Sequence, residues 1–310
     1  MVQFNALTRG PLRHVTLFEK HAAGAEGNVA IAVSRLGLSS GIITRVGDDE
    51  FGKFLLATFR SENVDTTHVE VDRDSPTAIF FIQRGYPIPG RSIVFYYRKG
   101  SAASKLSPTN LDPVYISSAK VLHITGITPA LSESAKQATM VAVQTAKEHG
   151  VVISFDTNVR LKLWKEEEAR TALLPICKRS DIVFTDKMDS RVILGTAQPE
   201  EVAETLHRSG VSTVVMKLGS EGAFASSKGE KVTEPLIETY VEDPTGAGDA
   251  FAAAFLTMHL KGWKLRDCLH AASASASLVV TVRGDYENAP DLDALKSYLD
   301  YTRGEAKYLR

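Results

Sequence analysis

The chain has 310 residues, of which 44% are hydrophobic and 24% charged, so its length allows one large or two medium-sized domains. Because 36 basic residues face 37 acidic ones, no sequence-wide basic field exists to hold nucleic acid or an anionic membrane. We therefore expect a small-molecule ligand, no nucleic-acid partner and no membrane. The two cysteines, Cys177 and Cys268, follow no disulfide or zinc-site spacing, which favours a reducing, cytoplasmic location.

The first hundred residues contain predicted helices and a predicted hairpin. Residues 28–36 and 49–60 have helical patterns, with a short strand at 42–43 between them. Two aromatic, β-branched segments, 77–84 and 92–98, flank a turn-rich spacer and predict an antiparallel hairpin inserted into an α/β domain. The hairpin is either a lid over a site or a decorative or dimer-forming hairpin.

Beyond residue 120 the pattern alternates between short β-branched runs and helical segments. This alternation is typical of a parallel sheet with crossover helices. The expected strands are 121–124, 151–155, 181–184 and 213–216, and the expected helices are 132–148, 165–178, 186–194 and 252–260.

The segment 242–251, EDPTGAGDAF, is the most informative. Gly246 and Gly248 precede a helix and let the backbone approach a ligand, so that free N–H groups at the helix N-terminus form an anion cradle. Asp249 falls in the first turn, where the helix N-terminus favours its ionised form. Such a carboxylate suits proton abstraction from an alcohol during phosphoryl transfer. The alternative is a helix-capping aspartate beside a tight turn.

Further glycine-rich segments occur at 24–28 and 45–52, whereas the Walker and GxGxxG fingerprints are absent from the sequence. With GAEGN at 24–28, VGDDEFG at 46–52 and DPTGAGDAF at 243–251, the chain resembles the ribokinase-like (PfkB) carbohydrate kinases. Within that family it is most similar to archaeal-type 2-keto-3-deoxygluconate kinases. The segments that carry this similarity are 81–89, 96–102, 156–164 and 282–285.

The resemblance implies a three-layer α/β/α fold with a mostly parallel central sheet and a small β lid. Residues 24–74 and 100–310 would form the core, and residues 1–23 and 75–99 the lid. The implied reaction uses ATP and Mg²⁺ to phosphorylate 2-keto-3-deoxygluconate at its terminal hydroxyl, with 2-keto-3-deoxygalactonate as a further candidate. By the same analogy, lid strands pair across a homo-oligomer.

The resemblance also assigns site residues by position. Asp249 matches the catalytic base, and Gly246, Ala247 and Gly248 match its anion hole. The expected substrate contacts are Gly24, Asn28, Phe80, Tyr96, Arg98, Arg160, Asp249 and Asp285. The expected nucleotide contacts are Arg160, Lys162, Lys217, Gly219, Ser220, Gly222, Gly246 and Gly248.

Arginine suits the carboxylate of a keto acid, because its guanidinium donates paired N–H groups that lysine lacks. Structural alternatives stay open for three of these residues: Tyr96 as a packing residue of the hairpin, Arg160 as a surface ion-pair partner of Glu166 or Glu167, and Lys217 as a solvated lysine at a strand end. Phe80 stands where close relatives have a tyrosine, which removes a hydroxyl that could bond the substrate.

Metal ligands are left unassigned. Asp186 and Asp189 keep the three-residue spacing of an Asn-x-x-Glu pair in relatives, which predicts two carboxylates on one helical face. They either act on Mg²⁺ through water or are ordinary acids at a helix N-terminus.

The resemblance carries one more expectation. Relatives open with a buried strand about ten residues before the segment matched by 3–5, so we expect the native chain to start upstream. Two other readings of the whole chain remain: a kinase for another sugar or a nucleoside, and a non-catalytic sugar- or nucleotide-binding regulator on the same fold.

Overall fold

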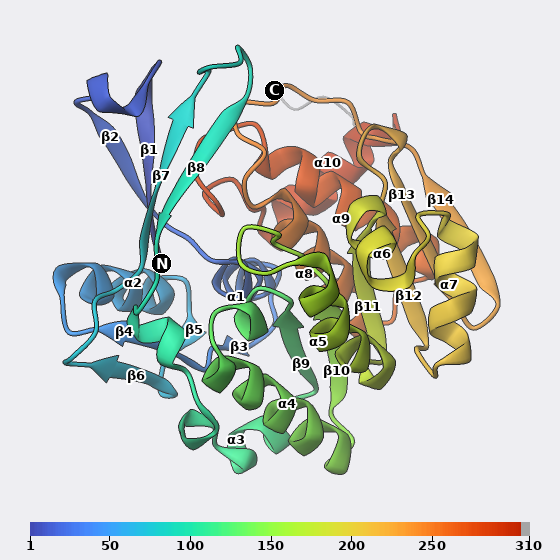
Figure 1. The fold of residues 1–310 in the computed structure, drawn as a ribbon. Coiled ribbons are helices and arrows are strands. Elements are labelled where there is room, and N and C mark those ends of the chain that lie inside the picture. The colour runs from blue at the N-terminus through green and yellow to red at the C-terminus, as the bar shows by residue number, and fades with distance from the viewer. Residues whose placement is uncertain (305–310) are drawn as a thin grey trace.

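The computed structural model describes residues 1–304, and its central element is a six-stranded sheet in the order β14-β13-β12-β11-β10-β9 (Figure 1). The strands β9 to β12 are parallel, and β13 and β14 add antiparallel strands at one edge. Their bounds are Val121–Thr125, Val152–Asp156, Ile182–Asp186, Thr213–Lys217, Ala223–Ser227 and Glu230–Glu234. The four strands predicted beyond residue 120 are confirmed.

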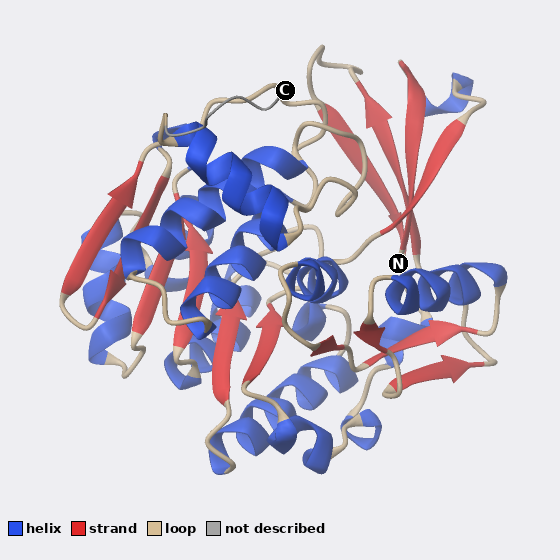
Figure 2. Ribbon diagram, turned by 180° about the vertical axis from the view of Figure 1, so that it is seen from behind, coloured by secondary structure: helices blue, strands red, loops and turns tan. Residues whose placement is uncertain are grey.

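Helices cover both faces of this sheet (Figure 2). Neighbouring residues of β11 show the two faces, because Ile182 and Phe184 join the core cluster of α8 and α9 whereas Val183 joins that of α4, α5 and α7. This arrangement confirms the three-layer α/β/α fold. The helix bounds are α3 Pro113–Ser118, α4 Glu133–Glu148, α5 Glu166–Arg179, α6 Lys187–Leu194, α7 Pro199–Arg208, α8 Ala247–Leu260, α9 Leu265–Val279 and α10 Leu292–Thr302.

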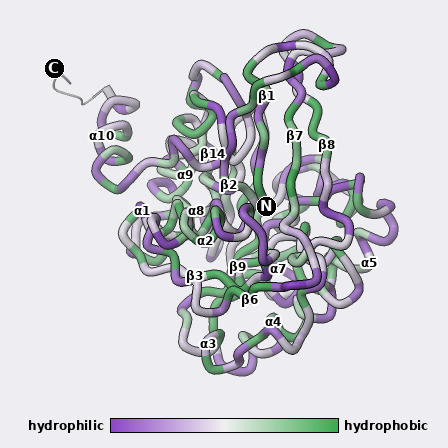
Figure 3. Tube along the Cα trace, turned by 90° about the vertical axis from the view of Figure 1, so that its left-hand side faces the viewer, coloured by the Kyte–Doolittle hydropathy of each residue, from purple (hydrophilic) through white to green (hydrophobic). Residues whose placement is uncertain are grey.

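A second sheet, called the lid sheet here, stands away from the core at the upper left of Figure 1. It has the order β2-β1-β7-β8, and β7 and β8 form the predicted antiparallel hairpin. Hydrophobic stretches run along β1 and β7 (Figure 3). The bounds are β1 Val2–Arg9, β2 Phe18–Ala22, β7 Ile79–Arg84 and β8 Ser92–Tyr97.

The segment between β2 and β7 forms two helices, α1 (Ala25–Arg35) and α2 (Glu50–Ser61), and two small parallel pairs. The expectation of a strand at 42–43 is wrong. These two apolar residues link β3, which pairs with β5, to β4, which pairs with β6. Of the two, only Ile42 bonds a strand, since its N–H donates to Asp65 O at 3.1 Å. The pairs join β3 Ser40–Gly41 to β5 Val64–Asp65 and β4 Thr44–Gly47 to β6 Val69–Asp72.

A cavity of about 1370 Å³ lies where the lid sheet meets the core. It is lined by the loop after β10, by the end of β12 and by the start of α8, and it extends between β9 and residues 38–46. Within residues 1–304 the outer side of β9 has no strand partner. The strand expected upstream of the segment 3–5 stays a prediction. Over the same residues, no helix combines the length and apolarity needed to cross a bilayer.

Candidate active site

Asp249 lies in the first turn of α8, at the bottom of the cavity. It is 9% exposed, and Asn28 Nδ2 donates to its Oδ2 at 2.7 Å. Burial raises the pKa of Asp249 to about 6, despite the hydrogen bond from Asn28. Desolvation is the largest cause of this shift, so the net effect of the surroundings favours the neutral form; that the helix N-terminus by itself favours the ionised form stays a prediction. A carboxyl group with this pKa is a suitable base near neutral pH.

The backbone before α8 brings free N–H groups beside this carboxyl. Gly246 is the N-cap of α8 with φ 78°, and the first N–H groups of a helix have no intrahelical acceptor. A Cβ at Gly246 would lie 1.7 Å from the Asp285 carbonyl oxygen, so only glycine fits this left-handed position. The loops before α8 and after α9 are thus in direct contact.

Lys217 adds a positive charge next to the anion cradle. Its Nζ lies 2.7 Å from Asp156 Oδ2 and would be 3.4 Å from a Cβ placed on Gly248. Burial alone would lower the pKa of Lys217, but the Asp156 carboxylate outweighs burial and raises it. Lys217 is therefore a charged, paired residue rather than a solvated lysine at a strand end.

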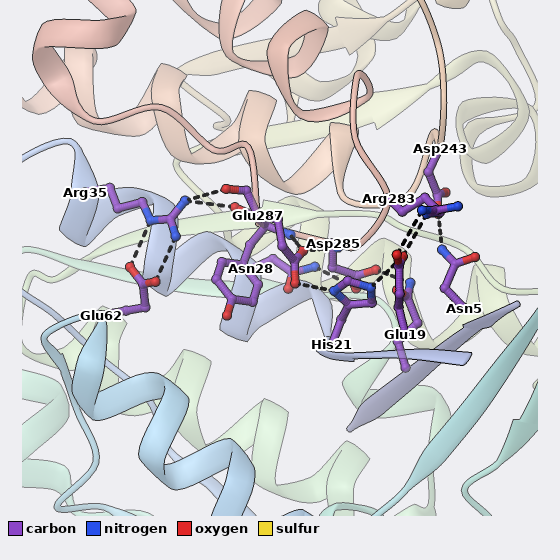
Figure 4. Close-up of polar contacts among 12 residues, drawn as sticks. Asn5, Glu19, His21, Asn28, Arg35, Glu62, Asp243, Arg283, Asp285 and Glu287 are labelled. Atoms are coloured by element: carbon purple, nitrogen blue, oxygen red, sulfur yellow. Dashed lines mark hydrogen bonds and ion pairs between the residues drawn. The ribbon is translucent and has the colours of Figure 1, made fainter. Parts of the chain in front are cut away.

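Asp285, labelled beside Asn28 in Figure 4, is a second buried carboxyl group of the site. Asn28 Nδ2 bridges the two carboxyl groups, since it lies 3.1 Å from Asp285 Oδ2, and Gln3 Nε2 donates to Asp285 Oδ1 at 2.7 Å. Burial raises the pKa of Asp285 to about 7, and the charge of Asp249 adds to the increase. Asn28 therefore orients the carboxyl groups of both Asp249 and Asp285.

An aromatic and cationic group faces the cavity from the other side. Strand register places Phe80 opposite Tyr96, with ring centroids 5.4 Å apart, and the Arg98 guanidinium stacks 4.1 Å from the Tyr96 ring. Burial lowers the pKa of Arg98, and the charge of Arg160 lowers it further, which places the two arginines within electrostatic reach. Within residues 1–304 Arg160 forms no ion pair, so the alternative pairing with Glu166 or Glu167 is not observed.

The predicted site positions can be compared with the residues that line the cavity. Those that line the cavity are Gly24, Phe80, Tyr96, Arg98, Arg160, Lys217, Gly219, Gly246, Gly248, Asp249 and Asp285. Asn28 contacts the site through its two aspartates. Ala247, Lys162, Ser220 and Gly222 are outside the lining; Lys162 Nζ instead approaches Val94 O of the lid sheet at 3.3 Å. The roles of these residues stay predictions.

The profile of the pfkB family carbohydrate kinases matches residues 1–292. The chain belongs to this family. It is 46% identical to a 2-dehydro-3-deoxygluconokinase of Thermoproteus tenax, over 94% of this chain and 89% of the relative. A 2-dehydro-3-deoxygluconokinase of Bacillus subtilis is 34% identical over 98% and 94%. Among solved structures, a protein assigned as Ribokinase II from E. coli, in complex with ATP and Mg²⁺, superimposes with TM-score 0.90 at 27% identity over 97% and 96%.

In this PfkB kinase Asp186 and Asp189, the acidic pair considered for Mg²⁺, lie at the start of α6, and both line the cavity. Asp186 is the N-cap of α6, and its Oδ1 accepts the Asp189 N–H at 2.8 Å. Asp189 turns into the protein and accepts from Thr157 Oγ1 at 2.7 Å and Val159 N at 3.0 Å. Burial raises the pKa of Asp189 to about 6 and the charge of Asp186 adds to the increase, so the two carboxylates lie within electrostatic reach of each other. Asp189 also shapes the loop that carries Arg160, and the action of the pair on Mg²⁺ through water stays a prediction.

Two further polar residues, Asp156 and Gln3, contact predicted site residues although neither is among the predicted positions. Asp156 pairs with Lys217, and Gln3 binds Asp285. Asp156 is a buried carboxylate at the end of β10, and Gln3 is a buried amide on β1; a buried polar side chain needs a partner. Nothing in the sequence identifies that partner, since each lies far away along the chain.

Proposed function

We propose that this PfkB kinase phosphorylates 2-keto-3-deoxygluconate at its terminal hydroxyl, giving 2-keto-3-deoxy-6-phosphogluconate, with ATP and Mg²⁺. The observation that carries the proposal is the charge distribution in one cavity. Asp249 and Lys217 lie at the N-terminus of α8, and Arg98 and Arg160 line the same cavity. One end suits a phosphoryl group, and the two arginines suit the carboxylate of a sugar acid. The 2-dehydro-3-deoxygluconokinase relatives support this substrate class.

At the phosphoryl end, Asp249 accepts the proton of the sugar hydroxyl while Asn28 keeps its carboxylate oriented. The N–H groups of Gly246, Ala247 and Gly248 and the ammonium group of Lys217 stabilise the negative charge that develops there. ATP supplies the phosphoryl group, and Mg²⁺ neutralises part of the charge on its phosphates. These residues form a cation-bearing glycine cradle that fits a phosphate chain.

The turn after β12 is the proposed nucleotide side of the site. Gly219, Ser220 and Gly222 lie in or beside this turn, and Gly219 and Lys217 line the cavity. Arg160, on the loop after β10, lines the same cavity, and Lys162 on that loop is a further proposed nucleotide contact. Over residues 1–304 no group of three or more His, Cys, Asp or Glu side chains could hold a metal ion. Mg²⁺ usually keeps several waters and binds through substrate phosphates, so this donor set fits a nucleotide-borne ion.

The sugar acid is proposed to lie between the lid sheet and α1. Arg98, held on the Tyr96 ring, and Arg160 bind its carboxylate. Its hydroxyl groups contact Gly24, Asn28, Tyr96 and Asp285, with Phe80 forming an apolar wall. Closure of the lid sheet over this space would exclude water from the reacting groups.

Two further proposals concern assembly and location. The outer face of the lid sheet is aromatic, and its exposed members include Phe95 and Tyr97, the latter 62% exposed. Such an apolar face favours a homo-oligomer in which lid sheets cover one another. The oligomeric state in solution, compared between the wild type and Tyr97→Lys, tests this proposal.

Both cysteines are free and buried, which supports a cytoplasmic location.

The test of the function is ADP release from ATP over a panel of sugar acids, neutral sugars and nucleosides. We expect turnover of 2-keto-3-deoxygluconate, with 2-keto-3-deoxygalactonate measured beside it, and a loss of about 10²- to 10⁴-fold in kcat for Asp249→Asn. Turnover of neutral sugars alone would refute the acid specificity. Binding without turnover of any compound would indicate a regulator, and full activity of Asp249→Asn would refute the mechanism.

A further inference from the structure

Two buried amide side chains on β1 each hold one aspartate of the core. Gln3 Nε2 donates to Asp285 Oδ1 at 2.7 Å, and Asn5 Nδ2 donates to Asp243 Oδ2 at 2.6 Å. Both amide residues are 0% exposed. Figure 4 shows Asn5 reaching Asp243 from the lid strand, and Asp285 on the neighbouring core loop. The inner face of the lid sheet is therefore tied to the core at two points of one strand.

The two aspartates belong to different loops beside Asp249. Asp243 precedes α8, and its Oδ1 accepts from the backbone N–H of Thr245 at 3.1 Å and from the Thr245 hydroxyl at 2.5 Å. Asp243 thus shapes the backbone that leads into the anion cradle. Asp285 follows α9 and shares Asn28 with Asp249. Asn5 consequently holds the loop at the phosphoryl end of the site through Asp243, and Gln3 holds the sugar end through Asp285.

The two amide side chains lower the stability of the folded protein, so packing does not explain them. Gln3 Oε1 and Asn5 Oδ1 are buried and have no hydrogen-bond partner within residues 1–304. A buried acceptor without a partner loses its solvation without compensation. Their cross-strand partners on β7, Phe80 and Ile82, are apolar and buried. Aliphatic residues at positions 3 and 5 would therefore suit a sheet whose inner face served only for packing. Local violations of this kind are expected at functional positions.

Other contacts hold the same two loops to the lid sheet. Arg84 Nη2 on β7 bonds both the backbone oxygen and the carboxylate of Glu242, next to Asp243. On β2, His21 Nδ1 lies 2.6 Å from Glu287 Oε1, and the other oxygen of Glu287 accepts the Asp285 N–H at 2.8 Å. Each of the two loops is therefore held to the lid sheet by more than one polar contact.

We propose that Gln3 and Asn5 are positioning residues that transmit the position of the lid sheet to the two ends of the active site. Gln3 orients Asp285 toward the sugar acid, and Asn5 orients the anion cradle toward the phosphoryl donor. The inference rests on the proposed function and deepens it. It makes the two residues a matched pair, since both are buried amides on the inner face of one strand and each binds one aspartate.

The test compares Gln3→Met and Asn5→Leu in the full chain, by steady-state kinetics with each substrate varied in turn. Loss of a hydrogen bond to a charged group corresponds to about a tenfold change or more in the KM or kcat that depends on that bond. We expect Gln3→Met to raise KM for the sugar acid about tenfold and to change KM for ATP by less than about twofold. We expect Asn5→Leu to show the reverse, with its effect on KM for ATP or on kcat.

Gln3→Glu and Asn5→Asp serve as variants of unchanged size, because they replace the donating amide by a carboxyl group that faces the same aspartate. Thermal unfolding is measured for all four, and the pair of unchanged size decides the outcome where an apolar variant does not fold. Equal effects of the two positions on both substrates, or no effect at all, would overturn the positioning roles. Failure of the wild type to phosphorylate any sugar acid would instead overturn the proposed function.

Discussion

Lys217 Nζ lies 2.7 Å from Asp156 Oδ2, so a largely buried ion pair joins the carboxyl ends of β12 and β10. Ligands of open α/β sheets bind at this edge of the sheet. The other carboxylate oxygen of Asp156 is buried and has no partner within residues 1–304. The pair therefore holds an ammonium group beside Gly248 at the expense of an unsatisfied acceptor.

Asp156→Asn should weaken both stability and phosphate binding. Removal of one partner of a buried ion pair costs about 3 kcal/mol or more in the free energy of unfolding, because the remaining charge is left uncompensated. We expect urea unfolding to show this loss, together with a higher KM for ATP. The double variant Asp156→Asn/Lys217→Met should be less destabilised than the sum of the two single variants. Strict additivity would contradict a direct interaction.

The activity should have an acid limb set by Asp249. Burial raises the pKa of this carboxyl to about 6, and it acts as a base only when it is ionised. We therefore expect kcat to fall as the pH decreases through about 6, measured over pH 5 to 9 with saturating substrates. A rate that stays constant down to pH 5 would contradict the assignment of a base with a pKa of about 6.

Asp285 should make the protein less stable as the pH rises. Its pKa is raised to about 7 in the folded protein, chiefly by burial, whereas the unfolded chain has an ordinary carboxyl pKa. Its contribution to stability is therefore fully present below the unfolded pKa and is lost as the pH rises through the folded pKa. We expect Asp285→Asn to gain stability relative to the wild type between pH 5 and pH 8 in urea unfolding. A difference independent of pH would contradict this assignment.

Phe80→Tyr should affect the sugar acid more than ATP. The Phe80 ring lines the cavity opposite Tyr96, so a hydroxyl at its edge would add a donor and acceptor near the proposed substrate. One hydrogen bond of about 0.5–1.5 kcal/mol corresponds to a change in KM of roughly two- to tenfold. Separate KM values for both substrates test this prediction, and equal changes in the two would contradict it.

Alanine at the two glycines of the anion cradle should have different consequences. At Gly246 the new Cβ would overlap the Asp285 carbonyl oxygen at 1.7 Å, and φ is 78°, so we expect loss of stability as well as activity. At Gly248 the nearest atom is Lys217 Nζ at 3.4 Å, so the fold should tolerate Gly248→Ala while phosphate binding weakens. Thermal unfolding and kinetics of both variants check this difference. Equal destabilisation would refute it.

The sequence by itself determined the layered fold, the hairpin and the position of Asp249 at a helix start. These features depend on local periodicity and on ordered motifs, which are readable along the chain. The predicted strand at 42–43 failed because two apolar residues carry no information about their pairing partners.

Only the tertiary structure decided the partners and the ionisation of the site. Asp156 meets Lys217 across 61 residues, and Gln3 meets Asp285 across 282, because the sheet and the lid bring distant strands together. Burial also raises the pKa of Asp249 to about 6, since desolvation depends on what surrounds a carboxyl in three dimensions and not on its position along the chain.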